Sequence, residues 1–224
     1  KGLELMGARI TEKEGYIIAE APSLSGADIH LDFPSVGATE NLLMAAVLAR
    51  GTTNICNVAR EPEIVDLQDF LNSMGARISG AGTDTIRVQG VRGLHATEHR
   101  VIPDRIEAGT HVIAAAITGS KIVVNNVIAE HIDPVVAKLR EAGVQISLGD
   151  GFLEVKGRTP SEGGIKPICV KTLPFPGFPT DTQPQLLVLL SIARGVSIVT
   201  ETIFENRYKH AAELIRMGAD IRVE

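Results

Sequence analysis

The 224-residue sequence contains no Trp, only two Cys and no long apolar run. Its longest apolar stretch is "LLVLLSIA" at residues 186–193, well short of the roughly 18 residues that a transmembrane helix requires. Two cysteines cannot build a disulfide framework, which favours a reducing compartment, the cytoplasm. Because free cysteines are among the most often buried side chains, we expect Cys56 and Cys169 to be small buried residues.

Several ligand-binding patterns are absent as well. No CxxC pair occurs, and we expect no metal site. Neither GxGxxG nor GxxxxGK[ST] occurs, so the sequence predicts no dinucleotide or ATP loop, and we expect no cofactor. The net charge of −5 argues against nucleic acid as a partner, and the short apolar runs argue against a membrane.

What the chain does contain is an internal repeat. The phrase "LNSMGARIS" at 71–79 returns in similar form as "LELMGARIT" at 3–11, "LREAGVQIS" at 139–147 and "LIRMGADIR" at 214–222. The glycines of these copies recur roughly every 70 residues, a longer period than that of common solenoids. Each copy is therefore expected to be a supersecondary unit of several elements.

Each unit is expected to contain a helix, a strand, a second helix and a hairpin, with another strand leading in. The first helix is apolar nearly all round, so we expect burial on every side at 38–50, 107–118 and 182–194. The second helix is amphipathic, as in "EPEIVDLQDFLNSMG" at 61–75. Such units pack most economically with helices inside and sheets outside, as an α/β fold of the inside-out barrel kind.

The repeat frame starts and stops inside a unit. Residues 1–10 correspond to the end of a second helix, and "ADIRVE" at 219–224 to one strand of a hairpin. We therefore expect a barrel truncated at both ends, in a piece of a longer polypeptide, with apolar surface exposed at each end. A closed or permuted array, in which one end pairs with the other, is the alternative that the pattern leaves open.

The loops that lead into the buried helices are the candidate site, because the units differ there at equivalent positions. Gly37, Arg105 and Asp181 occupy the same place in three successive frames. The backbone N–H groups of "SVGATEN" suit a phosphate at a helix start, and the Arg105 guanidinium suits a phosphate or a carboxylate. Asp181 could take a proton from a hydroxyl.

Each of these residues also has an ordinary structural interpretation. Asp181 could be a plain helix N-cap, and Arg105 could pair with Glu107 or Asp104 in a solvated ion cluster. The stretch "TETIFENR" at 200–207, taken alone, is typical of a polar loop. The residues alone therefore predict a repeated α/β scaffold with an anion-binding cleft that can activate a hydroxyl.

A resemblance to a known family extends this prediction. The UDP-N-acetylglucosamine 1-carboxyvinyltransferases contain segments similar to "PSVGATENLLMAA", "AREPEIVDL", "PDRIEAGT", "FPTDTQPQ" and "TETIFENRYKHAAELIRMGA", and the likeness runs through all 224 residues. It implies transfer of enolpyruvyl from phosphoenolpyruvate to the 3-hydroxyl of UDP-N-acetylglucosamine, the first committed step of bacterial peptidoglycan synthesis. It also implies a fold of two inside-out α/β barrel domains, each with three units.

The resemblance also assigns site residues. It implies a catalytic carboxylate at Asp181, which takes the proton of the sugar hydroxyl. It implies substrate contacts at Ser35, Val36 and Gly37 in a nucleotide-phosphate loop, at Ile203 beside the sugar, and at the cleft positions Glu61, Arg105 and Arg207. The domain crossing falls near "RVIPDR", which gives residues 1–101 to one barrel domain and 102–224 to the other.

Parts of the family's site have no counterpart in this sequence. Neither Cys56 nor Cys169 stands in a Gly-rich loop like the one that carries the family's general acid, a reactive Cys. We therefore expect the chain alone to be inactive, since its partners would include missing parts of its own polypeptide. A 5-enolpyruvylshikimate-3-phosphate synthase-like transferase and a non-catalytic sugar-nucleotide-binding module are the rival functions.

Overall fold

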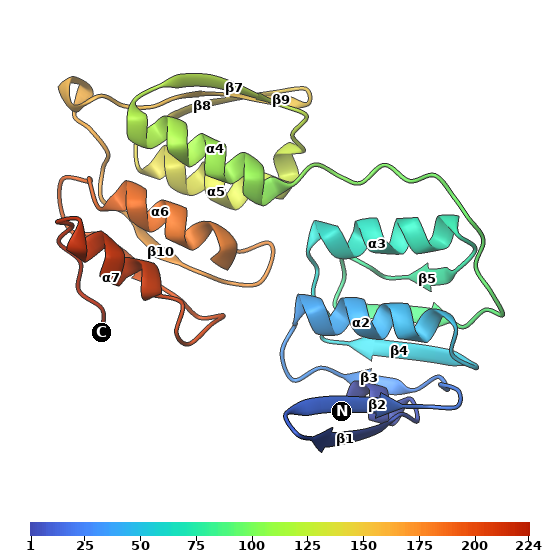
Figure 1. Cartoon of the computed structure of the whole chain (residues 1–224). Helices are drawn as coiled ribbons and strands as arrows, with labels where there is room; N and C mark the ends of the chain where they lie inside the picture. The colour runs from blue at the N-terminus through green and yellow to red at the C-terminus, as the bar shows by residue number, and fades with distance from the viewer. The chain divides into compact units, whose positions relative to one another are not determined.

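The computed structural model describes residues 1–224, apart from the side chain of residue 160 (Figure 1). The chain separates into two compact units that are larger than one sequence repeat: unit 1 is Lys1–Ile102 and unit 2 is Pro103–Glu224. Each unit has its own cluster of buried apolar side chains. Assignment of residues 1–101 and 102–224 to two separate barrel domains stays a prediction.

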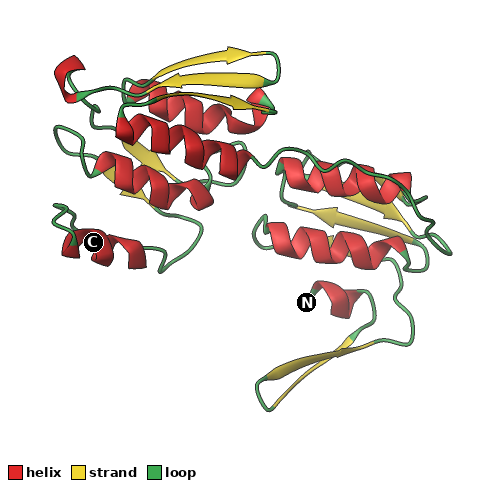
Figure 2. Cartoon of the chain, turned by 45° about the horizontal axis from the view of Figure 1, so that its top comes forward, coloured by secondary structure: helices red, strands yellow, loops and turns green.

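Unit 1 pairs two helices with a four-stranded sheet. Its strand order is β3-β4-β6-β5, with β3 parallel to β4 and the other pairs antiparallel. Helices α2 and α3 cover one face of this sheet (Figure 2). The elements are α1 (Gly2–Leu5), β1 (Arg9–Lys13), β2 (Tyr16–Glu20), β3 (Asp28–His30), α2 (Val36–Val47), β4 (Thr52–Cys56), α3 (Pro62–Ser73), β5 (Arg77–Ser79) and β6 (Thr85–Gln89).

Local sequence explains these elements. On β6, Ile86 and Val88 are fully buried while Arg87 between them is exposed, the alternation of a strand with one covered face. Helix α3 begins at Pro62, whose fixed φ suits the first turn. After the helix, Gly75 adopts a φ of 98°, which continues the chain into β5 without a Cβ penalty.

Unit 2 repeats the pattern. Its sheet β7-β9-β8 has the same antiparallel arrangement as β4-β6-β5, and β10 pairs with β11 in parallel, as β3 does with β4. The elements are α4 (Arg105–Thr118), β7 (Lys121–Asn125), α5 (Ala129–Glu141), β8 (Gln145–Gly149), β9 (Phe152–Lys156), η1 (Pro160–Glu162), β10 (Cys169–Lys171), η2 (Thr180–Thr182), α6 (Gln183–Leu190), β11 (Ile198–Thr200) and α7 (Lys209–Arg216).

The inside-out arrangement is visible in unit 2. Helix α4 packs against α5, α6 and the strands β7 and β9. In Figure 1 the sheet β7-β9-β8 lies on the outer side of α4 and α5. The predicted α/β fold with helices inside and sheets outside is confirmed, although no closed barrel forms within the described part of the chain.

Burial of the first helices differs from the prediction. Met44 of α2 and Leu48, its C-cap residue, are 49% and 59% exposed, because the main packing of α2 is on α1, α3 and the strands β4 and β6. Helix α4 comes closer to all-round burial, since it has two helices and a sheet around it, yet His111 faces solvent. The apolar composition of α2 therefore predicted burial on every side, whereas one side of this helix is exposed in the structure.

Three smaller expectations also need correction. Residues 219–224 form no strand among the described residues, because the chain offers them no neighbouring strand to bond. Residues 91–104, ahead of α4, form no leading strand either, since the segment is held against α3, where the His95 N–H donates to the Met74 carbonyl and His99 bonds Asp66. Cys169 is exposed because it lies on the outward side of β10, whereas Cys56 ends β4 and is half-buried.

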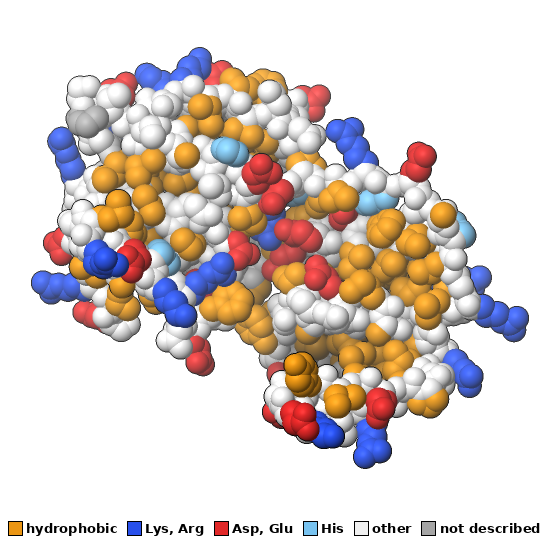
Figure 3. Space-filling model, in the orientation of Figure 1, with side chains coloured by type: hydrophobic (Ala, Val, Ile, Leu, Met, Phe, Trp, Pro, Cys, Tyr) orange, Lys and Arg blue, Asp and Glu red, His pale blue; other side chains and the backbone are white. Residues whose placement is uncertain are grey.

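Apolar side chains are exposed toward both ends of the sequence, as expected. Tyr16 and Ile17 of β2 are 73% and 78% exposed, and Val196 and Met217 are 85% and 84% exposed. Figure 3 shows hydrophobic side chains gathered over the visible face of unit 1. None of the helices in the described part of the chain is both long and apolar enough to cross a membrane.

A pair of equivalent glycines lets each hairpin return close to its first helix. A Cβ at Gly90 would collide with the carbonyl oxygen of Ala49, and one at Gly157 with that of Ala115. Both glycines directly follow the last hairpin strand, and their N–H groups donate to Gly51 and Ser120, just past the helix end. This contact joins the end of the hairpin to the end of the first helix, in α2 and its hairpin and in α4 and its hairpin.

We predict that Gly90→Ala destabilises unit 1 by about 1–3 kcal/mol, because the added methyl group forces two backbones apart. The matched control is Gly93→Ala, since a Cβ at this exposed glycine meets no atom within 4 Å. Urea denaturation of both variants measures the difference. Equal unfolding midpoints for the two variants would contradict the close approach at Gly90.

Candidate functional site

The predicted nucleotide-phosphate loop forms the start of helix α2. Ser35 is the N-cap, and its Oγ accepts a hydrogen bond from the Ala38 N–H at 3.3 Å. Buried Thr39 donates to the Ser35 carbonyl at 2.8 Å and accepts from the Ala59 N–H at 3.1 Å. Thr39 thereby fixes the helix start to the segment that leads into Glu61.

A pocket of about 560 Å³ opens beside this helix start, with Gly37 and Asn41 on its wall. Lys1 also lines it and pairs with Asp32 at 2.8 Å, which lowers the pKa of the Asp32 carboxyl, first through the hydrogen bond and then through the charge. Because Gly37 is exposed and lacks a side chain, a ligand can approach the backbone N–H groups of the first turn. This pocket of unit 1 suits an anion.

Carboxylates flank the same elements. Glu61, the N-cap residue of α3, is only 8% exposed and makes no side-chain capping bond. Burial, and after it the charge of Glu63, raises the pKa of Glu40 on α2. Carboxylates so placed can accept hydrogen bonds from hydroxyl groups, but they repel phosphate, so Ser35–Gly37 and Glu61 suit different parts of a ligand.

The start of helix α6 carries the predicted base. Asp181 lies in the 3₁₀ turn η2, and its Oδ1 accepts from Arg207 Nη2 at 2.6 Å. Its side chain remains 55% exposed. The cap position of α6 belongs to Thr182, and η2 is preceded by Pro179. Asp181 therefore engages a guanidinium and stays accessible, which favours a chemical role over the plain N-cap.

A network of hydroxyl groups and a second carboxylate surrounds this ion pair. Thr180 Oγ1 accepts from Arg207 Nη1 at 3.1 Å and donates to Glu201 Oε2 at 2.9 Å. Glu201 Oε1 accepts from Thr172 Oγ1 and from the Ile203 N–H, both at 2.8 Å. Burial would raise the pKa of Glu201, but these hydrogen bonds outweigh it and hold that pKa below its usual value.

The remaining predicted residues of unit 2 lie in the same region. Arg105 is the first residue of α4, and its guanidinium sits 5.4 Å from the centre of the Phe175 ring, in the loop that leads to Asp181. Asp104 caps α4 with bonds of 2.7 and 3.1 Å to backbone N–H groups. Ile203 is half-buried two residues after Glu201. Unit 2 thus gathers four of the predicted residues around η2: Arg105, Asp181, Ile203 and Arg207.

Arg207 organises the charges near η2. It lies over the Phe204 ring at 5.1 Å, besides its bonds to Thr180 and Asp181. Burial first, and then the charge of Arg207, lowers the pKa of His210 on the following helix. His210 is therefore held toward its neutral form.

Sequence reasoning passed over Thr172, Thr180 and Glu201. Glu201 stands in "TETIFENR", but the sequence of a polar loop does not distinguish a functional carboxylate from an ordinary one. Its role becomes visible only in the structure, where the segment with Thr172 and Thr180 lies against this loop. Ser35, Val36, Gly37 and Glu61 belong to unit 1, so the predicted residues divide between the two units.

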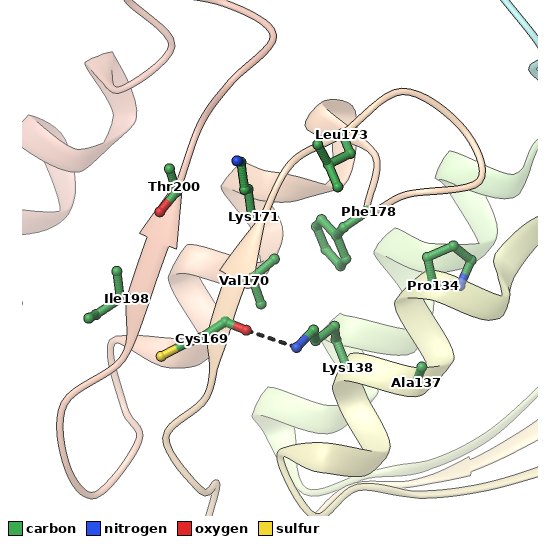
Figure 4. A pocket seen from close by; sticks show the side chains of 10 residues that line it. All are labelled: Pro134, Ala137, Lys138, Cys169, Val170, Lys171, Leu173, Phe178, Ile198 and Thr200. Carbon is green, nitrogen blue, oxygen red and sulfur yellow. Dashed lines mark hydrogen bonds between the residues drawn. The ribbon is translucent and has the colours of Figure 1, made fainter.

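A second groove, of about 470 Å³, is a poor candidate for the chemistry. It lies between helix α5 and the β10–β11 pair (Figure 4), and none of the predicted site residues lines it. Its polar lining includes Lys138, Lys171 and Thr200, and Lys138 Nζ donates to the Cys169 carbonyl at 2.8 Å. With mainly apolar walls and no carboxylate, the groove offers no proton acceptor.

Histidines at positions 95 and 99 have the spacing of a helical ligand pair, but they lie on an extended segment. His99 Nε2 bonds Asp66 at 2.9 Å, and its ring lies 5.1 Å from that of Phe70. Among the described residues, no three His, Cys, Asp or Glu side chains form a group that could hold a metal ion. His99 instead ties the segment after β6 to helix α3.

Comparisons with known proteins agree with the fold. The sequence model of the family described as EPSP synthase (3-phosphoshikimate 1-carboxyvinyltransferase) matches residues 1–224. UDP-N-acetylglucosamine 1-carboxyvinyltransferase 1 of Carboxydothermus hydrogenoformans is 60% identical over all of this chain and 52% of its own length. The protein of the same name from Symbiobacterium thermophilum is 61% identical, over 50% of its length. The chain thus spans about half the length of the curated relatives it matches.

Solved structures show the same architecture. The enolpyruvyl transferase NikO from Streptomyces tendae matches the whole chain with a TM-score of 0.82, at 22% identity and over 55% of its own chain. EPSP synthase from Acinetobacter baumannii matches 98% of the chain with a TM-score of 0.66, at 24% identity and over 52% of its own. At such identities these two matches establish the fold alone. The full-length family match goes further: the chain belongs to the family described as EPSP synthase (3-phosphoshikimate 1-carboxyvinyltransferase), and the two relatives at 60% and 61% identity carry the name UDP-N-acetylglucosamine 1-carboxyvinyltransferase.

Proposed function

We propose that residues 1–224 form part of a longer enzyme that transfers enolpyruvyl from phosphoenolpyruvate to the 3-hydroxyl of UDP-N-acetylglucosamine. Relatives of that name support this, and within unit 2 one observation carries it. Asp181, at the start of α6, is bonded to Arg207 yet more than half exposed. A carboxylate that is both fixed and accessible meets the requirements for a general base. The activity assigns the protein to peptidoglycan synthesis in the bacterial cytoplasm.

The proposed mechanism uses the two oxygens of Asp181 separately. Oδ1 stays on Arg207, and Oδ2 takes the proton of the sugar hydroxyl as the hydroxyl oxygen attacks C2 of phosphoenolpyruvate. A general acid protonates C3 in this step, and neither Cys56 nor Cys169 is assigned that role. Phosphate then leaves C2 while C3 gives up a proton, which restores the double bond as an enol ether.

Substrate binding divides among the other residues. Ser35, Val36 and Gly37 contact the diphosphate through the first turn of α2, where N–H groups converge and the helix dipole favours an anion. Arg105, Arg207, Ile203 and Glu61 supply further contacts to the two substrates. The guanidinium groups suit phosphate and carboxylate, and Glu61 suits a hydroxyl.

Two other functions have some support. The family description names 3-phosphoshikimate, which favours shikimate 3-phosphate as the acceptor. A sugar-nucleotide-binding module without catalysis is the other rival, because neither Cys56 nor Cys169 stands in a Gly-rich loop. Calorimetric titration with UDP-N-acetylglucosamine and a phosphate-release assay on the same full-length protein separate them. Release with shikimate 3-phosphate alone, or binding without release, would replace the proposal by one of these rivals.

We predict that Asp181→Asn in the full-length protein lowers turnover at least about 100-fold, because the amide cannot take the hydroxyl proton. The melting temperature changes little, since Asp181 is exposed and its side chain forms a single surface ion pair, with Arg207. Steady-state turnover at saturating substrates and a thermal melt test both statements. Near-normal turnover would remove Asp181 as the base, and a large drop in melting temperature would return it to a structural role.

Arg105→Ala is expected to weaken binding of an anionic substrate about 10-fold or more, because a charge-assisted contact is lost. Turnover at saturation should fall much less than in Asp181→Asn. Arg216→Ala is the matched control, since exposed Arg216 on α7 pairs only locally, with Glu213. Titration of phosphoenolpyruvate and of UDP-N-acetylglucosamine measures the effect, and unchanged affinity for both would exclude Arg105 from the binding site.

A further inference from the structure

We infer that Glu201 is a positioning residue that holds the Asp181–Arg207 pair in its working geometry through Thr180. The inference rests on the proposed function, because it matters only if Asp181 is the base. Glu201 lies at the point where β11 ends, and it contacts two neighbouring segments as well as its own loop. No bond links Glu201 directly to Asp181 in the described contacts, so its effect passes through a neighbour.

The two oxygens of Glu201 have different partners. Oε1 accepts from the backbone N–H groups of Ile203 and Phe204, at 2.8 and 3.2 Å, and from Thr172 Oγ1 at 2.8 Å. Oε2 accepts from Thr180 Oγ1 at 2.9 Å. Oε1 therefore shapes the loop that carries Ile203 and Arg207, while Oε2 reaches across to the turn that carries Asp181.

Thr180 links the carboxylate of Glu201 to that of Asp181, through Arg207. Its hydroxyl donates to Glu201 and accepts from Arg207 Nη1, while Arg207 Nη2 holds Asp181. The direction of these bonds is set by chemistry, because a guanidinium only donates and a carboxylate only accepts. The Thr180 proton must then point at Glu201, which leaves a lone pair aimed at Arg207.

Further bonds make the Glu201 end of this chain rigid. The Glu201 N–H donates to the Tyr208 hydroxyl at 2.8 Å, and that hydroxyl donates to the Val199 carbonyl at 3.2 Å. Fully buried Thr172 accepts from the Thr202 N–H at 2.9 Å. The backbone on both sides of Glu201 is thus fixed, so its carboxylate is a firm reference point for Thr180.

Glu201→Gln tests the inference selectively. The glutamine carbonyl can replace Oε1 and retain the loop bonds, while its NH₂ group takes the place of Oε2 and faces Thr180 as a donor. The Thr180 hydroxyl then meets two donors and loses the acceptor for its proton. The matched control is Glu162→Gln, because Glu162 also accepts backbone and hydroxyl bonds, both from Thr159, but has no recorded contact with the Asp181 network.

In the full-length protein we expect Glu201→Gln to lower kcat between about 10-fold and 100-fold, the loss typical of a misplaced catalytic group. KM for UDP-N-acetylglucosamine should change less than about 3-fold, because the proposed diphosphate contacts at Ser35–Gly37 do not involve Glu201. Thr180→Val should give the same loss, Thr180→Ser should restore most of the activity, and Glu162→Gln should match the wild type. The double variant Glu201→Gln/Thr180→Val should be no worse than either single variant, since both break one connection.

The outcomes separate this inference from the proposed function. If Asp181→Asn abolishes turnover but Glu201→Gln stays within twofold of Glu162→Gln, the positioning role is wrong and the base assignment stands. Additive losses in the double variant would also overturn it, because Glu201 and Thr180 would then act independently. If the wild-type protein releases no phosphate with either acceptor, the proposed function fails first. A crystal structure of Glu201→Gln with the Asp181–Arg207 pair unmoved would then refute the positioning geometry itself.

Discussion

The packing of each first helix against its own hairpin is the constraint on which the rest of the structure depends. The chain leaves the last hairpin strand beside the end of the helix, and only glycine fits there, at Gly90 in unit 1 and Gly157 in unit 2. With the far end of the helix held in this way, its start is fixed as well. The loops that lead into α2 and α4 therefore occupy equivalent and well-defined places, one in each unit.

Variation at these helix starts explains how one repeated scaffold carries several kinds of chemistry. At α2 a serine caps the helix and an exposed glycine uncovers backbone N–H groups. At α4 the cap is Asp104, and the next residue, Arg105, is directed toward the loop before η2. At α6 the helix is preceded by a 3₁₀ turn in place of a side-chain cap, and Asp181 in that turn is bound by Arg207. Accessible backbone N–H groups, a cation and a carboxylate thus arise from the same frame.

The sequence predicted those parts of the fold that depend on local pattern. Both α3 and its hairpin partner strands follow from apolar spacing, Pro62 and Gly75, and the repeat placed Asp181 at a helix start. The pattern could not show which faces of a helix have neighbours, so the exposure of Met44 was missed. Nor could it show the Glu201–Thr180 bond, which joins residues from different loops and exists only because β10 and β11 lie side by side.

Two carboxylates near η2 acquire different roles because their surroundings differ. Glu201 accepts four hydrogen bonds from neutral donors and is half-buried, so these bonds favour its charged form and fix its orientation. Asp181 accepts from one guanidinium and keeps most of its surface in solvent, where a substrate hydroxyl can reach it. A carboxylate that already accepts hydrogen bonds at both oxygens has little capacity left for a proton. A carboxylate that accepts a hydrogen bond at one oxygen keeps the other oxygen available for a proton. In the proposed mechanism, the base Asp181 is fixed through a second carboxylate, Glu201, that does not react, which separates the demands of rigidity and basicity that a single side chain meets poorly.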